Sequence, residues 1–267
     1  MAVVSRPPGS DQPGYDEKRM ELTEHLGELR TRIVRCLLYL AVSAAACYLL
    51  FQPIYGFLFR PMAEALVESK TTWTIAFPNF TEAFFVVLQI SVIAGAIVVS
   101  PLITMEMWGF IAPALTPRER RPLRFVAPLS VVLFVSGAVL SYWLASFAID
   151  WFLGYLRMFP GGAVLYQNPR TYVLFILKLM GAFGLVFQLP VVLMFLAWAG
   201  ILQSQSMVRS WRYAIVGISL LGAVVTPSND AFTMVMMTIP VIVLYVGSIW
   251  LVRLIERRRE RERAGGA

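Results

Sequence analysis

A lone glutamate in a basic loop is the residue with the clearest chemical potential in this chain. Glu119 is the only acidic residue in the segment FIAPALTPRERR (residues 110–121), which also carries two prolines and three arginines. Proline fixes φ and lacks a backbone donor, so the loop is expected to have a definite shape. A single carboxylate in a rigid basic loop could recognise a partner. The alternative, which residue types alone favour, is that the arginines simply anchor a loop at a membrane surface.

A second glutamate lies in a charged segment near the N-terminus. The stretch ELTEHLGELRTR (residues 21–32) places leucines at helical spacing, which predicts a short amphipathic helix on the inner membrane face. Glu28 in this stretch is four residues from Arg32. The two could form an ordinary surface pair of the kind common on helices.

The elements that position these glutamates are expected to be membrane helices. The chain has 267 residues, of which 58% are hydrophobic and 15% charged, and a mean hydropathy of +0.69. Soluble domains carry about 25% charged residues, and the apolar residues here come in long blocks. The net charge of +7 is concentrated in a few segments. It therefore fits an arginine-rich cytoplasmic face against anionic lipid better than a nucleic-acid partner.

The apolar blocks predict an all-α polytopic membrane protein with six transmembrane helices. The predicted spans cover about residues 33–51, 84–108, 125–149, 172–202, 213–225 and 231–252. They form a membrane domain (residues 21–252) between a disordered tail (1–20) and a basic tail (253–267). Arginines are enriched in both terminal segments and in alternate loops, so both termini are predicted to be cytoplasmic. Prolines inside the spans predict kinked helices around a concave bundle.

Five polar residues are expected within or close to the membrane, namely Gln89, Glu106, Lys178, Gln188 and Asp230. Glu106 and Lys178 lie towards the ends of their spans and could extend to the interface, although intramembrane ionisable groups often mark function. Gln188 lies mid-span beside Pro190. It could satisfy backbone groups that the proline leaves open, or it could contact a partner, and the sequence favours neither.

The remaining residue types give no indication of an enzyme, a cofactor or a metal. The two cysteines, Cys36 and Cys47, are eleven residues apart on one predicted helix, too far for a disulfide. His25 is the only histidine and lies outside the spans, so neither a serine–histidine protease nor a clustered metal site is expected. A secondary transporter of small solutes is the alternative function, because such proteins use broken helices and mid-membrane charge.

Five segments together resemble the TatC family, the multi-spanning subunit of the twin-arginine (Sec-independent) protein translocase. They are HLGELR (25–30), PNFTEAFF (78–85), FIAPALTPRERR (110–121), FGLVFQLP (183–190) and TPSND (226–230). The resemblance covers about residues 21–252. It implies a multi-pass cell-membrane receptor that binds twin-arginine signal peptides of folded cargo. It also implies single-span partners of the TatA and TatB types, self-association, and transport driven by the proton-motive force.

The same resemblance implies roles for individual residues. Glu28 and Glu119 match the carboxylates that bind the signal peptide, and two guanidinium groups could each form a two-bond fork with a carboxylate. Other positions that match the signal-binding site are Arg30, Arg121, Phe110 and Leu115. Positions that match a partner-contact or structural role are Gln188, Pro61 and Asp230. Arg30 and Arg121 would orient the carboxylates, Phe110 and Leu115 would border the path of the signal, and Pro61 would shape an outer cap.

Two positions depart from the family pattern. Gln188 stands where many members have a glutamate, so a titrating role is not expected there. Glu106 stands where glutamine is frequent.

Overall fold

The computed structural model describes residues 13–69, 72–111, 117–156, 158–159, 164–225 and 231–264. Nearly all of these residues are helical. The helices and strands are α1 (Pro13–Leu49), α2 (Phe51–Ser69), β1 (Thr72–Ile75), α3 (Glu82–Ile111), α4 (Pro117–Leu156), β2 (Val164–Gln167), α5 (Pro169–Val186), α6 (Leu189–Trp198), α7 (Ser204–Arg209), α8 (Trp211–Val225) and α9 (Ala231–Ala264).

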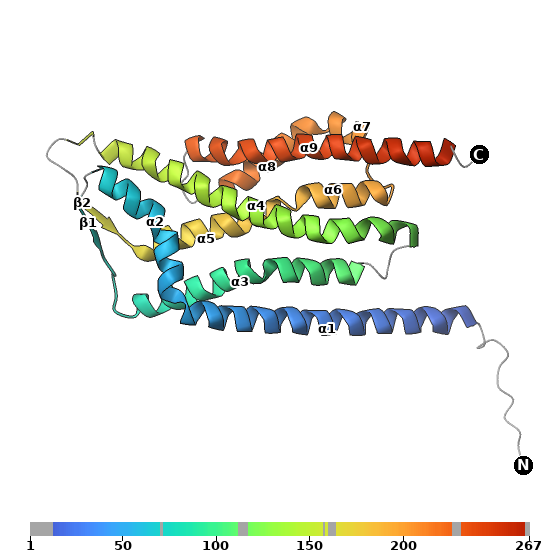
Figure 1. Ribbon diagram of the computed structural model, residues 1–267, viewed down its shortest axis with the longest axis horizontal. Helices are drawn as coiled ribbons and strands as arrows, with labels where there is room; N and C mark the ends of the chain where they lie inside the picture. Colours follow the sequence, from blue (N-terminus) through green and yellow to red (C-terminus); the bar gives the residue numbers. More distant parts are fainter. Residues whose placement is uncertain are drawn as a thin grey trace, which may run out of the picture.

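The long helices run side by side, with α1 and α3 on one side of the bundle and α9 on the other (Figure 1). Helix α1 begins and α9 ends at the same end, which we call the terminal end. Helix α2 and the two strands lie at the opposite end, which we call the distal end. The start of α1 and the end of α9 therefore share one side of the bundle.

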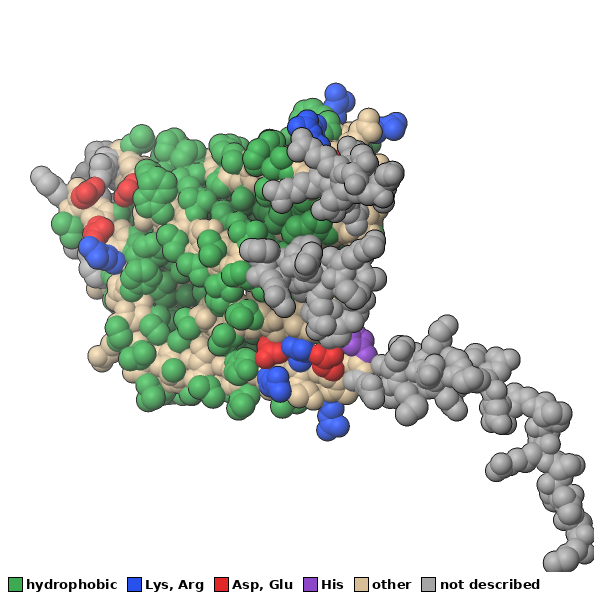
Figure 2. Space-filling view, turned by 45° about the vertical axis from the view of Figure 1, so that its right-hand side comes forward, with side chains coloured by type: hydrophobic (Ala, Val, Ile, Leu, Met, Phe, Trp, Pro, Cys, Tyr) green, Lys and Arg blue, Asp and Glu red, His purple; other side chains and the backbone are tan. Residues whose placement is uncertain are grey.

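Hydrophobic side chains dominate the middle of the surface, and charged side chains gather at its two ends (Figure 2). Among the residues that the structure describes, five helical segments are long and apolar enough to cross a membrane, namely His25–Leu49, Glu82–Ile111, Val126–Tyr155, Pro169–Trp198 and Met234–Arg257. Helix α8 has 15 residues, or about 22 Å of rise against a hydrocarbon core of about 30 Å. The fold is thus the expected polytopic helical membrane protein, and α8 coincides with the short fifth span of the prediction.

The two ends of the chain extend the membrane helices further than the sequence pattern suggested. Residues 21–32 do not form a separate surface helix, because α1 runs without interruption from Pro13 to Leu49. No proline follows Pro13 until Pro53, so nothing breaks the hydrogen-bond ladder between the charged segment and the span. Helix α9 likewise continues to Ala264, because arginine, glutamate and leucine are good helix formers.

The fourth span is broken, as its proline predicts. Helix α5 ends at Val186 and α6 begins at Leu189, with Pro190 in the first turn of α6. The carbonyl of Gln188 accepts from Val191 N and Val192 N, both at 3.0 Å, which starts the new helix. Pro101 and Pro240, in contrast, lie inside continuous helices α3 and α9.

Small residues let the helices approach closely where α1 crosses α3. A Cβ built on Gly95 of α3 would lie 2.7 Å from the backbone nitrogen of Ala44 in α1. The hydroxyl of Ser43 donates to the carbonyl of Gly95 at 3.0 Å across the same crossing. Close backbone approach at small residues is the usual way in which membrane helices pack. This crossing fixes the relative placement of α1 and α3, and with it the terminal ends of both helices.

The distal end contains a short two-stranded sheet and the capped start of α5. Strands β1 and β2 pair in parallel, with Thr72 opposite Val164. The side chain of Asn168 caps α5 by accepting from Arg170 N and donates to Glu82 at 3.0 Å. Pro61 lies buried inside α2, within the distal layer that the sequence predicted as a cap.

Candidate functional site

A bridge of three charged side chains joins α1 to α3 at the terminal end. Arg32 donates from Nε (3.0 Å) and Nη2 (2.6 Å) to Oε1 of Glu28. Its Nη1 donates to Oε2 of Glu106 at 2.8 Å and to the backbone oxygen of Glu106 at 3.3 Å. One guanidinium therefore holds two carboxylates from different helices, and its charge also lies near the C-terminal end of α3, where the helix dipole favours a cation.

Two further groups from α1 approach Glu106 more loosely. Arg35 Nη1 lies 3.9 Å and Tyr39 Oη 3.5 Å from Oε1 of Glu106. The exposed fractions of the side chains are 16% for Glu106, 22% for Arg32 and 31% for Glu28. Glu106 is thus the inner carboxylate of the bridge, and Glu28 is the one more open to solvent.

An aromatic stack lies beside the bridge. The rings of His25 and Phe110 are 4.3 Å apart between centroids with an interplanar angle of 11°. Gly109, next to Phe110, leaves room for the guanidinium, since a Cβ there would lie 2.4 Å from Arg32 Nη1. The histidine and the charged side chains lie together at the terminal end (Figure 2). The site therefore combines a carboxylate pair with a flat apolar surface.

The structure brings together part of the predicted site. His25 links Glu28 and Phe110, because its ring stacks on Phe110 and its Nδ1 lies 3.8 Å from Oε2 of Glu28. Arg30 is exposed and pairs with no described residue, so Arg32 is the arginine beside Glu28. Glu119 and Arg121 belong to the first turns of α4, and their side chains lie outside the described residues. Leu115 and Asp230 also lie outside the described residues.

Gln188 connects the broken fourth span to α4. Its Nε2 donates to the backbone oxygen of Ser130 at 2.8 Å. The hydroxyl of Ser130 in turn accepts from Trp108 Nε1 at 2.9 Å. The amide of Gln188 thus links the helix break to a hydrogen-bonded contact between α3 and α4.

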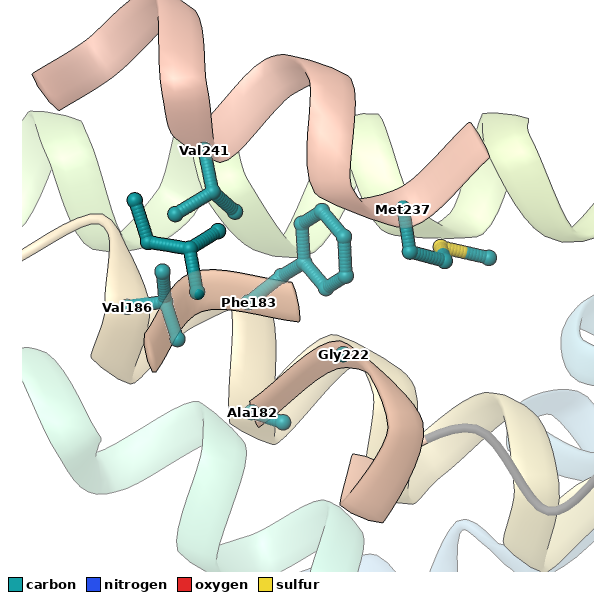
Figure 3. A pocket seen from close by; sticks show the side chains of 7 residues that line it. Ala182, Phe183, Val186, Gly222, Met237 and Val241 are labelled. Carbon is teal, nitrogen blue, oxygen red and sulfur yellow. The ribbon is translucent and has the colours of Figure 1, made fainter. Parts of the chain in front are cut away.

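An apolar hollow lies between α5, α8 and α9. In Figure 3, Phe183 and Val186 of α5 face Met237 and Val241 of α9. The remaining lining residues are Ala182, Ile218 and Gly222. Lys178, one helical turn before Ala182 on α5, is exposed and has no ion pair with a described residue.

Sequence reasoning missed the bridge to Glu106. Arg32 and Glu106 are 74 positions apart, and only the packing of α1 on α3 brings them together. A usable signal was present, because an acidic residue near the cytoplasmic end of one span and an arginine at the same level of another are candidates for a pair. The Glu28–Arg32 pair was visible from its spacing of four residues.

The chemistry of the bridge is pairing between carboxylates and a guanidinium group. Carboxylates bind guanidinium groups through short, charge-assisted hydrogen bonds, and Arg32 demonstrates this on both Glu28 and Glu106. In the part of the chain that the structure describes, no three His, Cys, Asp or Glu side chains gather as a metal site would require. The molecule is thus a polytopic α-helical membrane protein with a carboxylate–arginine–carboxylate bridge at one end of its bundle.

Comparison with known proteins identifies the family within this class. The sequence matches the family described as Sec-independent protein translocase protein (TatC) over residues 24–240. It is 34% identical over 250 residues to the TatC protein of Xylanimonas cellulosilytica, covering 94% of this chain and 90% of that protein. It is 36% identical over 245 residues to the TatC protein of a Synechocystis species, covering 90% of this chain and 91% of that one.

Solved structures agree with the sequence comparison. A crystal structure of the twin-arginine translocase receptor TatC in DDM superposes with a TM-score of 0.74 at 30% identity, covering 85% of this chain and 98% of that one. The chain belongs to the TatC family, and it is a subunit of the Sec-independent twin-arginine translocase. It is accordingly a transport component and not an enzyme.

Proposed function

We propose that this chain is the signal-peptide receptor of its translocase and binds twin-arginine signals at the terminal end, in the cytoplasm. The observation that carries the proposal is Glu28, a partly exposed carboxylate that already accepts two hydrogen bonds from a guanidinium. A peptide arginine requires the same acceptor. Glu119, in the first turn of α4, is the second carboxylate of the proposal.

Orientation follows from charge. Arginines are concentrated in the segments that begin or end at the terminal end, including Arg30, Arg32 and Arg35 of α1 and Arg253 and Arg257 of α9. The positive-inside rule assigns such an end to the cytoplasm. Signal peptides of folded cargo arrive from that side.

The stacked pair His25 and Phe110 supports the proposal from a second direction. A signal peptide follows its arginines with an apolar segment, which needs an apolar surface next to the carboxylates. Phe110 provides one beside Glu28, at the point where α3 approaches the membrane surface.

The test is the binding of a twin-arginine peptide to the purified protein in nanodiscs, beside a twin-lysine peptide. Glu28→Gln is expected to weaken twin-arginine binding by about 1–3 kcal/mol, the range for hydrogen bonds to charged groups at a partly exposed site, and Glu119→Gln is expected to act in the same direction. Glu64→Gln is the matched control, because Glu64 also accepts from an arginine four residues away, Arg60, at 2.7 Å, but at the distal end. Equal binding of both peptides, unaffected by Glu28→Gln, would refute the receptor role.

We further infer that TatA-type and TatB-type single-span subunits contact the membrane face of α5 and α6, and that transport draws on the proton-motive force. Lys178, exposed on α5 without a described ion pair, supports this because an isolated ammonium in a span gains from a polar or acidic neighbour. Export by a Lys178→Leu, Gln188→Leu double variant is expected to fall, and Val139→Ala, an exposed apolar position on α4 and so outside the proposed contact, is the control. Normal export by the double variant would count against this contact. Family membership leaves the secondary transporter unfavoured.

A further inference from the structure

We propose that Arg32 binds Glu28 while no signal peptide is present, and that Arg32 moves from Glu28 to Glu106 when a peptide arginine binds Glu28. Glu106 and Arg32 are thus positioning residues for the binding site. The inference rests on the proposed receptor function and deepens it, because it states how a carboxylate already engaged by an arginine can receive another.

The hydrogen-bond pattern shows an arginine divided between two acceptors. Both of its contacts to Glu28 go to Oε1, and among the described residues only His25 Nδ1, at 3.8 Å, pairs with Oε2 of Glu28. Its third nitrogen, Nη1, already contacts Glu106. Arg32 can therefore move fully onto Glu106 by a change of side-chain rotamer, without first passing through an unpaired state.

Glu106 has capacity for a closer contact. Among the described residues, its Oε1 has only two long contacts, with Arg35 Nη1 at 3.9 Å and Tyr39 Oη at 3.5 Å. A guanidinium turned towards Glu106 could engage both carboxylate oxygens in the two-bond geometry that carboxylates favour. Gly109 leaves the space for such a turn, since no side chain of its own blocks the guanidinium.

The difference in exposure between the two glutamates determines which of them Arg32 binds when a peptide is present. Glu106 is the less exposed carboxylate, at 16% against 31% for Glu28. A peptide that approaches from solvent reaches Glu28 first, and Arg32 retreats to the inner acceptor. The exchange also favours arginine over lysine, because a lysine ammonium is a point charge that cannot reproduce the forked contact it displaces.

The exchange predicts a specific dependence between two substitutions. Glu106→Gln removes the charge of the inner acceptor, so Arg32 stays on Glu28 and competes with the peptide. Twin-arginine binding is expected to weaken about tenfold, a coupling within the range seen for contacting residues. Removing the competitor as well, in the Arg32→Gln, Glu106→Gln double variant, is expected to restore affinity to within about threefold of the wild type.

The experiment measures the dissociation constant of the twin-arginine peptide for the wild type, both single variants and the double variant in nanodiscs. A merely structural bridge predicts the opposite for the double variant, which would bind no better than Glu106→Gln. That result, or unchanged binding by Glu106→Gln, would overturn the exchange. Arg32→Lys provides a second measurement if Glu106→Gln does not fold. Lysine lacks the planar fork with which one guanidinium holds both carboxylates, so its hold on Glu28 is weaker and tighter peptide binding is expected. Unchanged or weaker binding would count against the exchange.

Failure of the inference is distinguishable from failure of the receptor function. If the wild type prefers the twin-arginine peptide and Glu28→Gln abolishes this preference, the receptor function holds. The Glu106 variants then test the exchange on its own. If the wild type shows no preference and Glu28→Gln has no effect, the receptor function is refuted and the exchange with it.

Discussion

The crossing of α1 and α3 offers a direct test of how the site is positioned. Gly95→Ala would place a methyl group 2.7 Å from Ala44 N and 2.8 Å from Ala44 Cα. Both atoms belong to the backbone of α1, so no side-chain rotation relieves the contact. Ordinary van der Waals contact begins at 3.4 Å, so the two backbones would have to separate by about 0.7 Å. The hydrogen bond from Ser43 Oγ to the carbonyl of Gly95 spans the same gap and would lengthen with it.

The expected cost follows from two opposing effects. Forcing an extra methyl group into a packed contact costs about 1–3 kcal/mol, and a backbone obstacle places this case at the upper end. Alanine gains about 0.8–1 kcal/mol over glycine in helix propensity. The net loss in the free energy of unfolding is therefore expected to be about 1–2 kcal/mol. Gly181→Ala is the matched control, because a Cβ there meets only Ile97 at 3.8 Å, so only the propensity gain applies.

The assay is unfolding of the purified protein in detergent, followed by tryptophan fluorescence. Gly95→Ala should unfold more readily than the wild type, and Gly181→Ala should be equal or more stable. The same preparation should also bind the twin-arginine peptide more weakly, because the bridge between Arg32 and Glu106 depends on the spacing of α1 and α3. A Gly95→Ala protein as stable as Gly181→Ala would show that the crossing is looser than these distances indicate.

Three further substitutions test contacts around the bundle. Ser130→Ala leaves the buried Trp108 Nε1–H without its acceptor, and should cost about 1–3 kcal/mol of unfolding free energy, with a shift in tryptophan emission. Asn168→Ala removes the N-cap of α5 and the bond to the distal end of α3, and should cost about 0.5–2 kcal/mol, seen as a lower Tm. Glu256→Ala removes the acceptor of Ser204 N (2.8 Å) and of its hydroxyl, and should speed hydrogen exchange in α7 while α5 keeps its protection. An unchanged Tm of Asn168→Ala, or an unchanged exchange rate in α7 of Glu256→Ala, would contradict the corresponding contact.

Local features of this protein could be predicted from its sequence because they depend on near neighbours in the chain. Long apolar blocks must bury in lipid, so the polytopic helical class follows from composition and order alone. Pro190 lacks a donor and breaks the fourth span near Gln188. Glu28 and Arg32 are four residues apart on a helix, which places them on one face. The segments resembling the TatC family were likewise contiguous, and the family comparison bears them out.

The ends of the helices could not be predicted well, because the pattern of charged residues does not show where a helix stops. The charged residues 21–32 were expected to lie on the membrane as a separate helix, yet they continue α1. Helix termination needs a residue that breaks the ladder, and a change from apolar to charged residues does not provide one. The same reason explains the extension of α9 to Ala264.

Tertiary structure alone decided which distant residues meet. The pairing of Arg32 with Glu106 depends on the crossing at Gly95 and Ala44, far along both helices from the charged groups. The parallel pair β1–β2 joins two distal segments, Thr72–Ile75 and Val164–Gln167, that lie far apart in the sequence. Helix crossings are set by the fit of side-chain volumes between two surfaces, and no single segment contains that information. The sequence by itself determined the class, the apolar helices and the carboxylates available for recognition, whereas packing determined that one arginine holds two of them.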